Sequence, residues 1–342
     1  MWFEGLTGFL EESPEQVRKY LSVEGEVLKS SVNGNAMTCG LLETPSLAEL
    51  RERVRSGKSG AGKLSVREVV VQDLHTDESL AGSLFQVASQ FNLLEMISTS
   101  RTPEHGVGIY EHDRTQGPAC AIAAGAGTIY RNYFAVVNGE IGQTANNQID
   151  CLADLGEALG NSGGNLWEMR NGYAMATKSG LTRISDLLRG SNETALDELR
   201  QLLRIGVQSN TQVTLKGCHH LVSQVYCSAL PIAYCAHPLS IWEGFARLVL
   251  EASYEATMCA AILNSRSTGN NKVFLTFVGG GAFGNPDAWI TGATNRALEL
   301  NRNFDIDVAL VSYGGPSKLS RQMIESFTRS GQNRGPGATS EV

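Results

Sequence analysis

The last third of the chain alternates between patterns of buried strands and patterns of helices, and this alternation limits the possible folds more than any other feature. Apolar runs typical of strands occupy 222–235, 272–278 and 307–313. Between them, 242–263 and 286–300 carry apolar side chains at helical spacing. A helix that connects neighbouring strands packs on a face of the sheet. The sequence therefore predicts an α/β fold whose helices cover a central sheet.

Charge and composition exclude several classes of protein. The 342 residues include 28 Lys and Arg against 35 Asp and Glu, and this net charge of −7 does not suit a protein that binds nucleic-acid phosphates. The apolar fraction of 42% is enough for a sizeable core. No apolar run approaches the ~20 residues of a membrane-spanning helix. We therefore expect neither nucleic-acid nor membrane partners.

The expected location is the cytoplasm. The N-terminal residues lack the cationic and apolar regions of a signal peptide. Seven cysteines without a CxxC pair favour free thiols in a reducing compartment. A chain translocated into a host cell would show the same features.

The chain divides into three parts by pattern. Residues 1–65 are predicted to form a helix, a hairpin and a second helix as an N-terminal extension. Residues 66–325 carry the main α/β domain, within which the Asn-, Gly- and Ser-rich segment 134–215 is expected to be an insertion. Residues 329–342 are expected to be a disordered tail.

A glycine-rich segment joins the predicted strand at 272–278 to the helix at 286–300. The backbone N–H groups and the positive helix end at such a junction point toward one place, which suits a phosphate or pyrophosphate. Phe283 is expected to lie against a sugar. A tight turn with no ligand is the alternative. The residues of this predicted anion site are Gly279, Gly280, Gly281, Ala282, Phe283, Gly284 and Asn285.

A second cluster of polar residues follows the predicted strand at 84–91. Ligands collect at the carboxyl ends of strands in α/β sheets, so these amides, hydroxyls and acids suit recognition of a sugar phosphate together with carboxylate catalysis. The alternative for each acid is a solvated loop charge. The predicted binding residues are Gln90, Asn92, Thr115, Gln116 and Gly117, and Tyr313 at the end of the last strand is a candidate to stack on a base.

The same residues resemble a known family. Residues 273–313 resemble the last strand–loop–helix–strand unit of the macrodomain fold, and 84–133 resemble a divergent branch of macrodomain-like ADP-ribosylhydrolases. The resemblance implies a three-layer α/β/α fold with a mixed sheet, in which the glycine loop wraps the diphosphate and distal ribose of ADP-ribose. By position, it also implies that the catalytic acids are Asp113, Glu104 and Glu95.

The resemblance has a clear departure. Residues 88–92 (ASQFN) stand where ordinary macrodomains carry Asn-Ala-Ala-Asn and a glycine run, so their substrate-assisted mechanism is not carried over. One enzyme of the divergent branch removes ADP-ribose from an arginine of ubiquitin. The resemblance therefore implies an ADP-ribosylated protein as substrate, with ubiquitin as one candidate.

Three functions are open at this point. The first is hydrolysis of the N-glycosidic bond between ADP-ribose and a protein arginine by two carboxylates, with no metal and no cofactor besides the ligand ADP-ribose. The second is an ADP-ribose reader without turnover. The third is hydrolysis of an ADP-ribose ester or a free metabolite, which does not need a second carboxylate for its leaving group.

Overall fold

A seven-stranded mixed sheet forms the centre of the protein in a computed structural model, which describes residues 1–57, 62–70, 74–312 and 317–333. From edge to edge, its strands are β4 (Leu41–Glu43), β11 (Gly206–Gln212), β12 (Leu221–Cys227), β6 (Leu84–Ala88), β13 (Lys272–Leu275), β14 (Asp307–Ser312) and β5 (Ser65–Val70). The five strands from β12 to β5 are parallel, whereas β4, β11 and β12 pair antiparallel. Parallel strands end at one edge of the sheet, so the loops after β6, β12 and β13 gather there.

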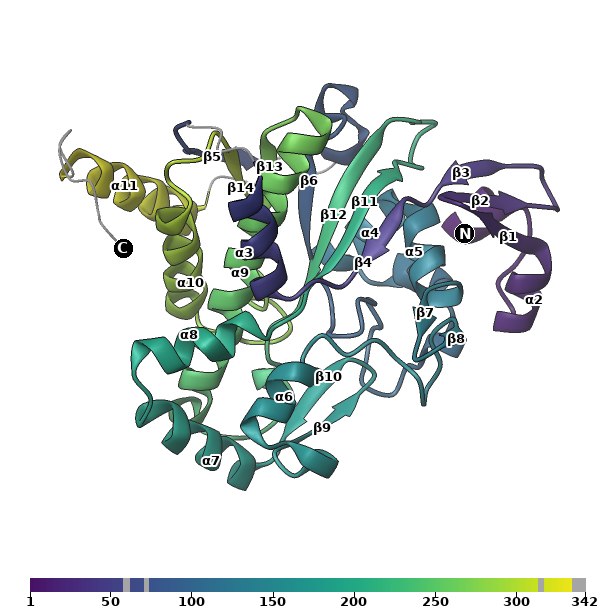
Figure 1. The fold of residues 1–342 in the computed structure, drawn as a ribbon. Coiled ribbons are helices and arrows are strands. Elements are labelled where there is room, and N and C mark those ends of the chain that lie inside the picture. Colours follow the sequence, from purple (N-terminus) through teal and green to yellow (C-terminus); the bar gives the residue numbers. More distant parts are fainter. Residues whose placement is uncertain (58–61, 71–73, 313–316, 334–342) are drawn as a thin grey trace.

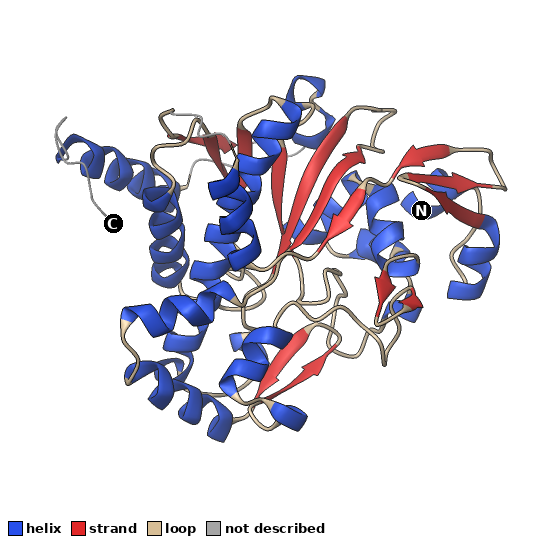
Figure 2. Ribbon diagram, in the orientation of Figure 1, coloured by secondary structure: helices blue, strands red, loops and turns tan. Residues whose placement is uncertain are grey.

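Helices cover both faces of this sheet (Figures 1 and 2). One face carries α9 (Leu239–Thr268) and α10 (Asp287–Leu300), with α3 (Leu47–Ser56) packed on α9. The other face carries α4 (Gln116–Ala123), which packs on β6, and α5 (Gly125–Tyr133), which packs on β11. The expected α/β class, with a mixed sheet in three layers, is thus confirmed. No helix of the described residues combines the length and apolarity needed to cross a bilayer.

The helix α9 is anchored to the sheet by packing and by one buried polar network. Trp242, Phe245 and Val249 belong to the same buried apolar cluster as the strands. Within this layer, Gln86 of β6 donates to Thr257 Oγ1 of α9 at 3.0 Å. The Gln86 oxygen accepts the N–H of Thr276, just after β13, at 3.2 Å. Because the amide is satisfied on both sides, it links the helix and two strands at little desolvation cost.

Several strands are shorter than the apolar runs predicted. The runs 84–91, 222–235 and 272–278 leave the sheet after Ala88, Cys227 and Leu275. After β13, for example, Tyr254 Oη donates to the Thr276 carbonyl at 2.6 Å and accepts the Val278 N–H at 3.0 Å. These bonds replace sheet pairing, and the apolar residues that follow line the loops at the strand ends.

The segments 1–65 and 134–215 each contribute a strand to the central sheet, namely β4 and β11. The sequence of β11 (GVQSNTQ) does not show the apolar pattern of a strand, because two of its buried residues, Gln208 and Thr211, are polar. The other elements of the first segment are α1 (Trp2–Thr7), α2 (Pro14–Tyr20), β1 (Leu21–Glu24), β2 (Val27–Ser30) and β3 (Ala36–Thr38). Those of the second are β7 (Val136–Val137), β8 (Glu140–Ile141), α6 (Ala153–Leu159), β9 (Trp167–Arg170), β10 (Tyr173–Ala176), α7 (Lys178–Arg189) and α8 (Glu193–Gln201).

The C-terminal segment begins as a helix. Helix α11 (Lys318–Asn333) includes 329–333, the first part of the segment expected to be disordered. The rest of that segment, 334–342, lies outside the described residues.

Two helix glycines provide a test of the packing. A Cβ on Gly180 of α7 would lie 2.2 Å from the Leu166 carbonyl oxygen, whereas one on Gly292 of α10 would meet nothing within 4 Å. Gly180→Ala is expected to lower the free energy of unfolding by about 1–3 kcal/mol through overpacking against rigid backbone. Gly292→Ala is expected to raise it by about 0.5–1 kcal/mol, because alanine loses less backbone entropy. Urea denaturation measures both, and equal effects would contradict the close approach.

Candidate functional site

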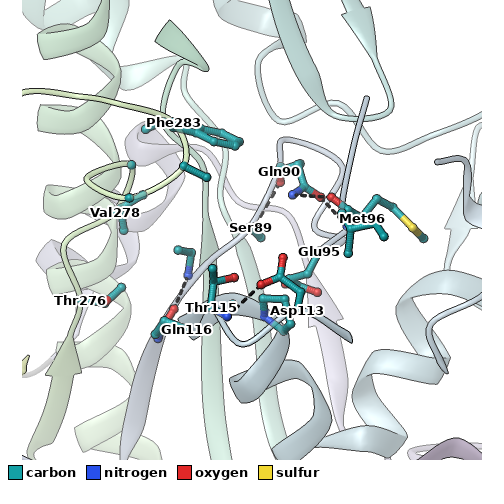
Figure 3. Close-up of a pocket in the computed structure, with 18 of the residues that line it drawn as sticks. Ser89, Gln90, Glu95, Met96, Asp113, Thr115, Gln116, Thr276, Val278 and Phe283 are labelled. Carbon is teal, nitrogen blue, oxygen red and sulfur yellow. Dashed lines mark hydrogen bonds between the residues drawn. The ribbon is translucent and has the colours of Figure 1, made fainter. Parts of the chain in front are cut away.

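The two predicted clusters meet in one pocket at the carboxyl ends of β6 and β13 (Figure 3). Its volume is about 180 Å³. The first cluster arrives on the loops after β6 and before α4, and the second on the loop after β13. The predicted residues that line the pocket are Gln90, Glu95, Asp113, Thr115, Gln116, Gly117, Gly279, Gly281, Ala282 and Phe283.

Other predicted residues lie outside the pocket lining. They are Asn92, Glu104, Gly280, Gly284 and Asn285. Tyr313, predicted to stack on a base, lies outside the described residues.

The amides after β6 shape their own loop. The Gln90 side chain accepts the Met96 N–H at 2.9 Å and donates to the Met96 carbonyl at 3.3 Å. Asn92 Oδ1 accepts the Leu94 N–H at 3.1 Å. Because these groups are already engaged, their role in the geometry is to hold the loop that presents Glu95.

Glu95 is buried, with a relative exposure of 2%. Neither carboxyl oxygen has a hydrogen-bond partner among the described residues. Burial raises the pKa of Glu95 to about 8, although the guanidinium of the equally buried Arg131, at 3.9 Å, opposes this rise. At neutral pH, Glu95 is therefore mostly protonated and able to donate a proton into the pocket.

Asp113 has a different environment. It is half-buried, and its Oδ1 accepts the Thr115 N–H at 2.8 Å. This turn directs the carboxylate toward the pocket, across from Phe283 (Figure 3). The pocket thus holds two carboxyl groups, one enclosed and one in a polar setting, which is the arrangement that separates acid and base roles.

Helix α4 begins against the end of β6. The Gln116 side chain accepts the Ala88 N–H at 2.9 Å and donates to the Gln86 carbonyl at 2.8 Å, so it continues the hydrogen bonding of the strand. A Cβ on Gly117 would lie 2.0 Å from the Ala88 carbonyl oxygen. Gly117 therefore allows the helix to approach the strand, and Gln116 fixes its position rather than presenting a free amide.

Glu104 lies outside the lining of this pocket. Its Oε1 accepts the Ala145 N–H at 2.8 Å. Burial raises its pKa, but hydrogen bonds from Thr102 and Ala145 outweigh that effect, and the net change is a lowered pKa. In the structure, this carboxylate stabilises the turn that precedes Asn147, and the catalytic role of Glu104 stays a prediction.

The glycine loop presents free backbone donors. Within the part of the chain that the structure describes, the N–H groups of Gly281, Ala282 and Phe283 donate no hydrogen bond. Asn285 fixes the ends of this loop. Its Nδ2 donates to the Leu230 carbonyl at 3.0 Å and to the Gly279 carbonyl at 3.2 Å. Three successive unpaired donors at a pocket wall are suited to an anion such as a diphosphate.

Three aromatic residues of the pocket were missed from the sequence, and one of them, Phe277, lies just before the glycine segment. Tyr173 and Tyr234 also line the pocket, and their rings lie 5.3 Å and 5.7 Å from that of Phe283. Tyr173 begins β10 and donates to the Met96 carbonyl at 2.8 Å, whereas Tyr234 ends a short 3₁₀ helix (Ile232–Tyr234). No local motif marks either residue, because the contacts that bring them here are long-range.

A second cavity adjoins the pocket. It has a volume of about 380 Å³ and shares Thr115, Gln116 and Thr276 with the pocket. Phe85 and Phe274 lie in its wall, stacked with ring centroids 4.6 Å apart. Both faces of the buried Phe85 ring are covered, one by Phe274 and the other by His75, whose ring lies 3.9 Å away.

No group of three or more metal-binding side chains occurs among the described residues.

Comparisons with known proteins give only distant similarities. No known family's sequence pattern matches the chain, and no curated protein matches it. Poly(ADP-ribose) glycohydrolase from Thermomonospora curvata is a structural neighbour at 11% identity and a TM-score of 0.45, over 92% of this chain and 96% of that chain. The enzyme from Deinococcus radiodurans in complex with ADP-ribose shows 12% identity and a TM-score of 0.45, over 84% and 93%. These TM-scores are too low to assign a function to this chain.

The pKa of Glu95 leads to a pH prediction. Since the pKa rises from 4.5 to about 8 on folding, the folded state holds a proton that the unfolded state releases in this range. The stability of the folded state that depends on this protonated carboxyl is therefore full below about pH 4.5, and it is lost as the pH rises toward 8. Removing the carboxyl in Glu95→Gln should make the variant progressively more stable relative to wild type over that window, by at most about 5 kcal/mol. Denaturation at several pH values measures this, and parallel stability curves would contradict it.

Proposed function

We propose that the chain binds ADP-ribose in this pocket and hydrolyses the N-glycosidic bond that links ADP-ribose to an arginine of a protein. The observation that carries the proposal is the pairing of free backbone donors with two carboxyl groups of opposite environment in one pocket. Ubiquitin is a candidate target, on the strength of the sequence resemblance alone.

The ligand would run along the strand ends. The N–H groups of Gly281, Ala282 and Phe283 would bind the diphosphate, and the Phe283 ring would pack on the distal ribose. The adenine would lie in the adjoining cavity, past the shared residues Thr115 and Gln116. This direction brings the anomeric carbon to the side of the pocket that carries the acids.

The two carboxyl groups would divide the chemistry. Glu95, protonated at neutral pH, would donate to the departing guanidine nitrogen while the bond to the anomeric carbon breaks. Asp113 would accept a proton from the attacking water as the ribose passes through an oxocarbenium-like state. Water adds a hydroxyl to the anomeric carbon, and the guanidine leaves with the proton from Glu95.

The buried acid distinguishes this proposal from a reader. A module that only binds ADP-ribose has no use for a carboxyl group whose two oxygens lack partners, because enclosing such a group destabilises the fold. An ester leaving group, in turn, departs without a second acid. The presence of both Glu95 and Asp113 in the pocket therefore favours the arginine linkage over an ester.

A binding test uses the glycine loop. Gly279 has a φ of 80°, and a Cβ there would lie 2.4 Å from the Ala229 Cβ. Gly279→Ala is expected to distort the loop and weaken ADP-ribose binding at least ~10-fold, about 1.4 kcal/mol. Gly292→Ala, on α10 beyond the loop, is the matched control and should keep the affinity. Isothermal titration calorimetry measures both, and unchanged affinity in Gly279→Ala would remove the diphosphate from this loop.

The catalytic test measures ADP-ribose release from arginine-linked and glutamate-linked protein substrates. Release from the arginine linkage is expected to fall ~10²–10⁴-fold in Asp113→Asn and in Glu95→Gln, because each removes a proton-transfer group. ADP-ribose affinity should be retained, since neither acid contacts the diphosphate.

Glu104→Gln completes that experiment. Its carboxylate bonds to Ala145 outside the pocket, so turnover should stay near the wild-type rate. A loss would support the predicted catalytic role of Glu104. Release from the ester alone would indicate an ester hydrolase, and binding without release from either substrate would indicate a reader.

A further inference from the structure

We propose that Glu11, in the N-terminal arm (residues 1–20), is a positioning residue that sets the spacing of Glu95 and Asp113. The inference rests on the proposed function and extends it to a part of the chain that lies outside the pocket. The arm lies beside α4 and α5, at the side of the molecule marked by the N-terminus in Figure 1.

Glu11 binds the segment that leads into Asp113. Its Oε1 accepts the Val107 N–H at 3.0 Å and the Tyr133 hydroxyl at 2.7 Å. Its Oε2 accepts the Gly108 N–H at 2.6 Å. Val107 and Gly108 begin the 3₁₀ helix Gly108–His112, whose first N–H groups lack partners within the helix. Bonds from such groups to a carboxylate are stronger than bonds between neutral groups.

A continuous series of hydrogen bonds runs from this contact to both acids. The Val107 carbonyl accepts the Tyr110 N–H at 3.1 Å, and the Tyr110 carbonyl accepts the Asp113 N–H at 3.1 Å. The Tyr110 hydroxyl accepts the Glu95 N–H at 3.1 Å. Tyr110 therefore connects the two carboxyl-bearing residues, and Glu11 holds the turn on which Tyr110 sits.

The fit around Glu11 is close. A Cβ on Gly106 would lie 2.4 Å from Glu11 Oε2, and one on Gly108 would lie 2.8 Å from it. The arm and the segment also share one buried cluster, in which Phe3 and Phe9 join Val107 and Tyr110. A change at Glu11 would thus move the turn rather than be absorbed by loose packing.

The primary variant is Glu11→Gln. Its amide keeps one acceptor oxygen but sets an NH₂ donor against a backbone N–H donor. We expect kcat on the arginine-linked substrate to fall about 10²-fold, the effect of an ~1 Å misplacement of reacting groups. KM and ADP-ribose affinity should stay unchanged, because Glu11 touches neither the glycine loop nor the loop after β6. Hydrogen exchange of residues 106–115 should become faster.

Two further variants separate positioning from loss of folding. Gly108→Ala places a Cβ against the Glu11 carboxylate and so disturbs the same contact while the Glu11 charge is kept. It should likewise lower kcat and leave KM unchanged. Glu15→Gln, an exposed acid on the same arm, and Gly5→Ala, whose Cβ would meet nothing within 4 Å, are the matched controls and should behave as wild type.

The outcomes are distinct. Unchanged kcat in folded Glu11→Gln, or a fall in kcat matched by lost ADP-ribose affinity, overturns the inference. If Glu11→Gln does not fold, Gly108→Ala decides by the same criteria. If the wild type releases ADP-ribose from no substrate, the proposed function fails, and unchanged exchange of residues 106–115 in Glu11→Gln would separately show that Glu11 does not hold this segment.

Discussion

The buried pair of Glu95 and Arg131 is the constraint on which the site depends. Both side chains are almost fully enclosed, yet their closest atoms are 3.9 Å apart, and neither Glu95 oxygen is otherwise bonded among the described residues. Enclosing charges in this way costs several kcal/mol per ion. Arg131 recovers part of that cost by stacking 3.6 Å above the Tyr226 ring and by donating to the Leu93 carbonyl at 3.1 Å. Glu95 has few contacts that offset this cost, so its neutral form is favoured.

Three separate parts of the chain hold the loop after β6. Arg131 of α5 binds Leu93, and Gln143 donates to the Asn92 carbonyl at 3.1 Å. The turn before β10 lies against it from another side, where the Gly172 carbonyl accepts the Phe91 N–H at 3.0 Å. The mid-chain segment therefore supports the site directly, and it also supplies Tyr173. A buried carboxyl needs this rigidity, since a loose loop would admit water and restore its ordinary pKa.

Local sequence predicted those parts of the structure that local interactions determine. The strand–glycine–helix pattern at 272–300 predicted the loop with free donors, because a run of glycines between a strand and a helix has few other conformations. The family resemblance implied Glu95 and Asp113 as catalytic acids, and both line the pocket beside that loop. Glu104 lies outside the pocket lining, and its carboxylate bonds to Ala145, some forty residues away, which no spacing rule connects to it. The same reason concealed Tyr173, and the polar face of β11 concealed that strand.

The difference between the two acids follows from which partners are near in sequence. Asp113 finds its partner two residues away, in the Thr115 N–H, so its turn forms locally and leaves the carboxylate in contact with the pocket. Glu95 has no local partner, and the packing of Leu94 and Met96 into the cluster beneath the arm draws it inside. The Asp113 carboxyl thus lies in a polar and accessible environment, whereas the Glu95 carboxyl lies in an enclosed one without hydrogen-bond partners. This asymmetry arises from folding alone, before any ligand binds, and under the proposed function it would let two chemically similar side chains act as base and acid in the same reaction.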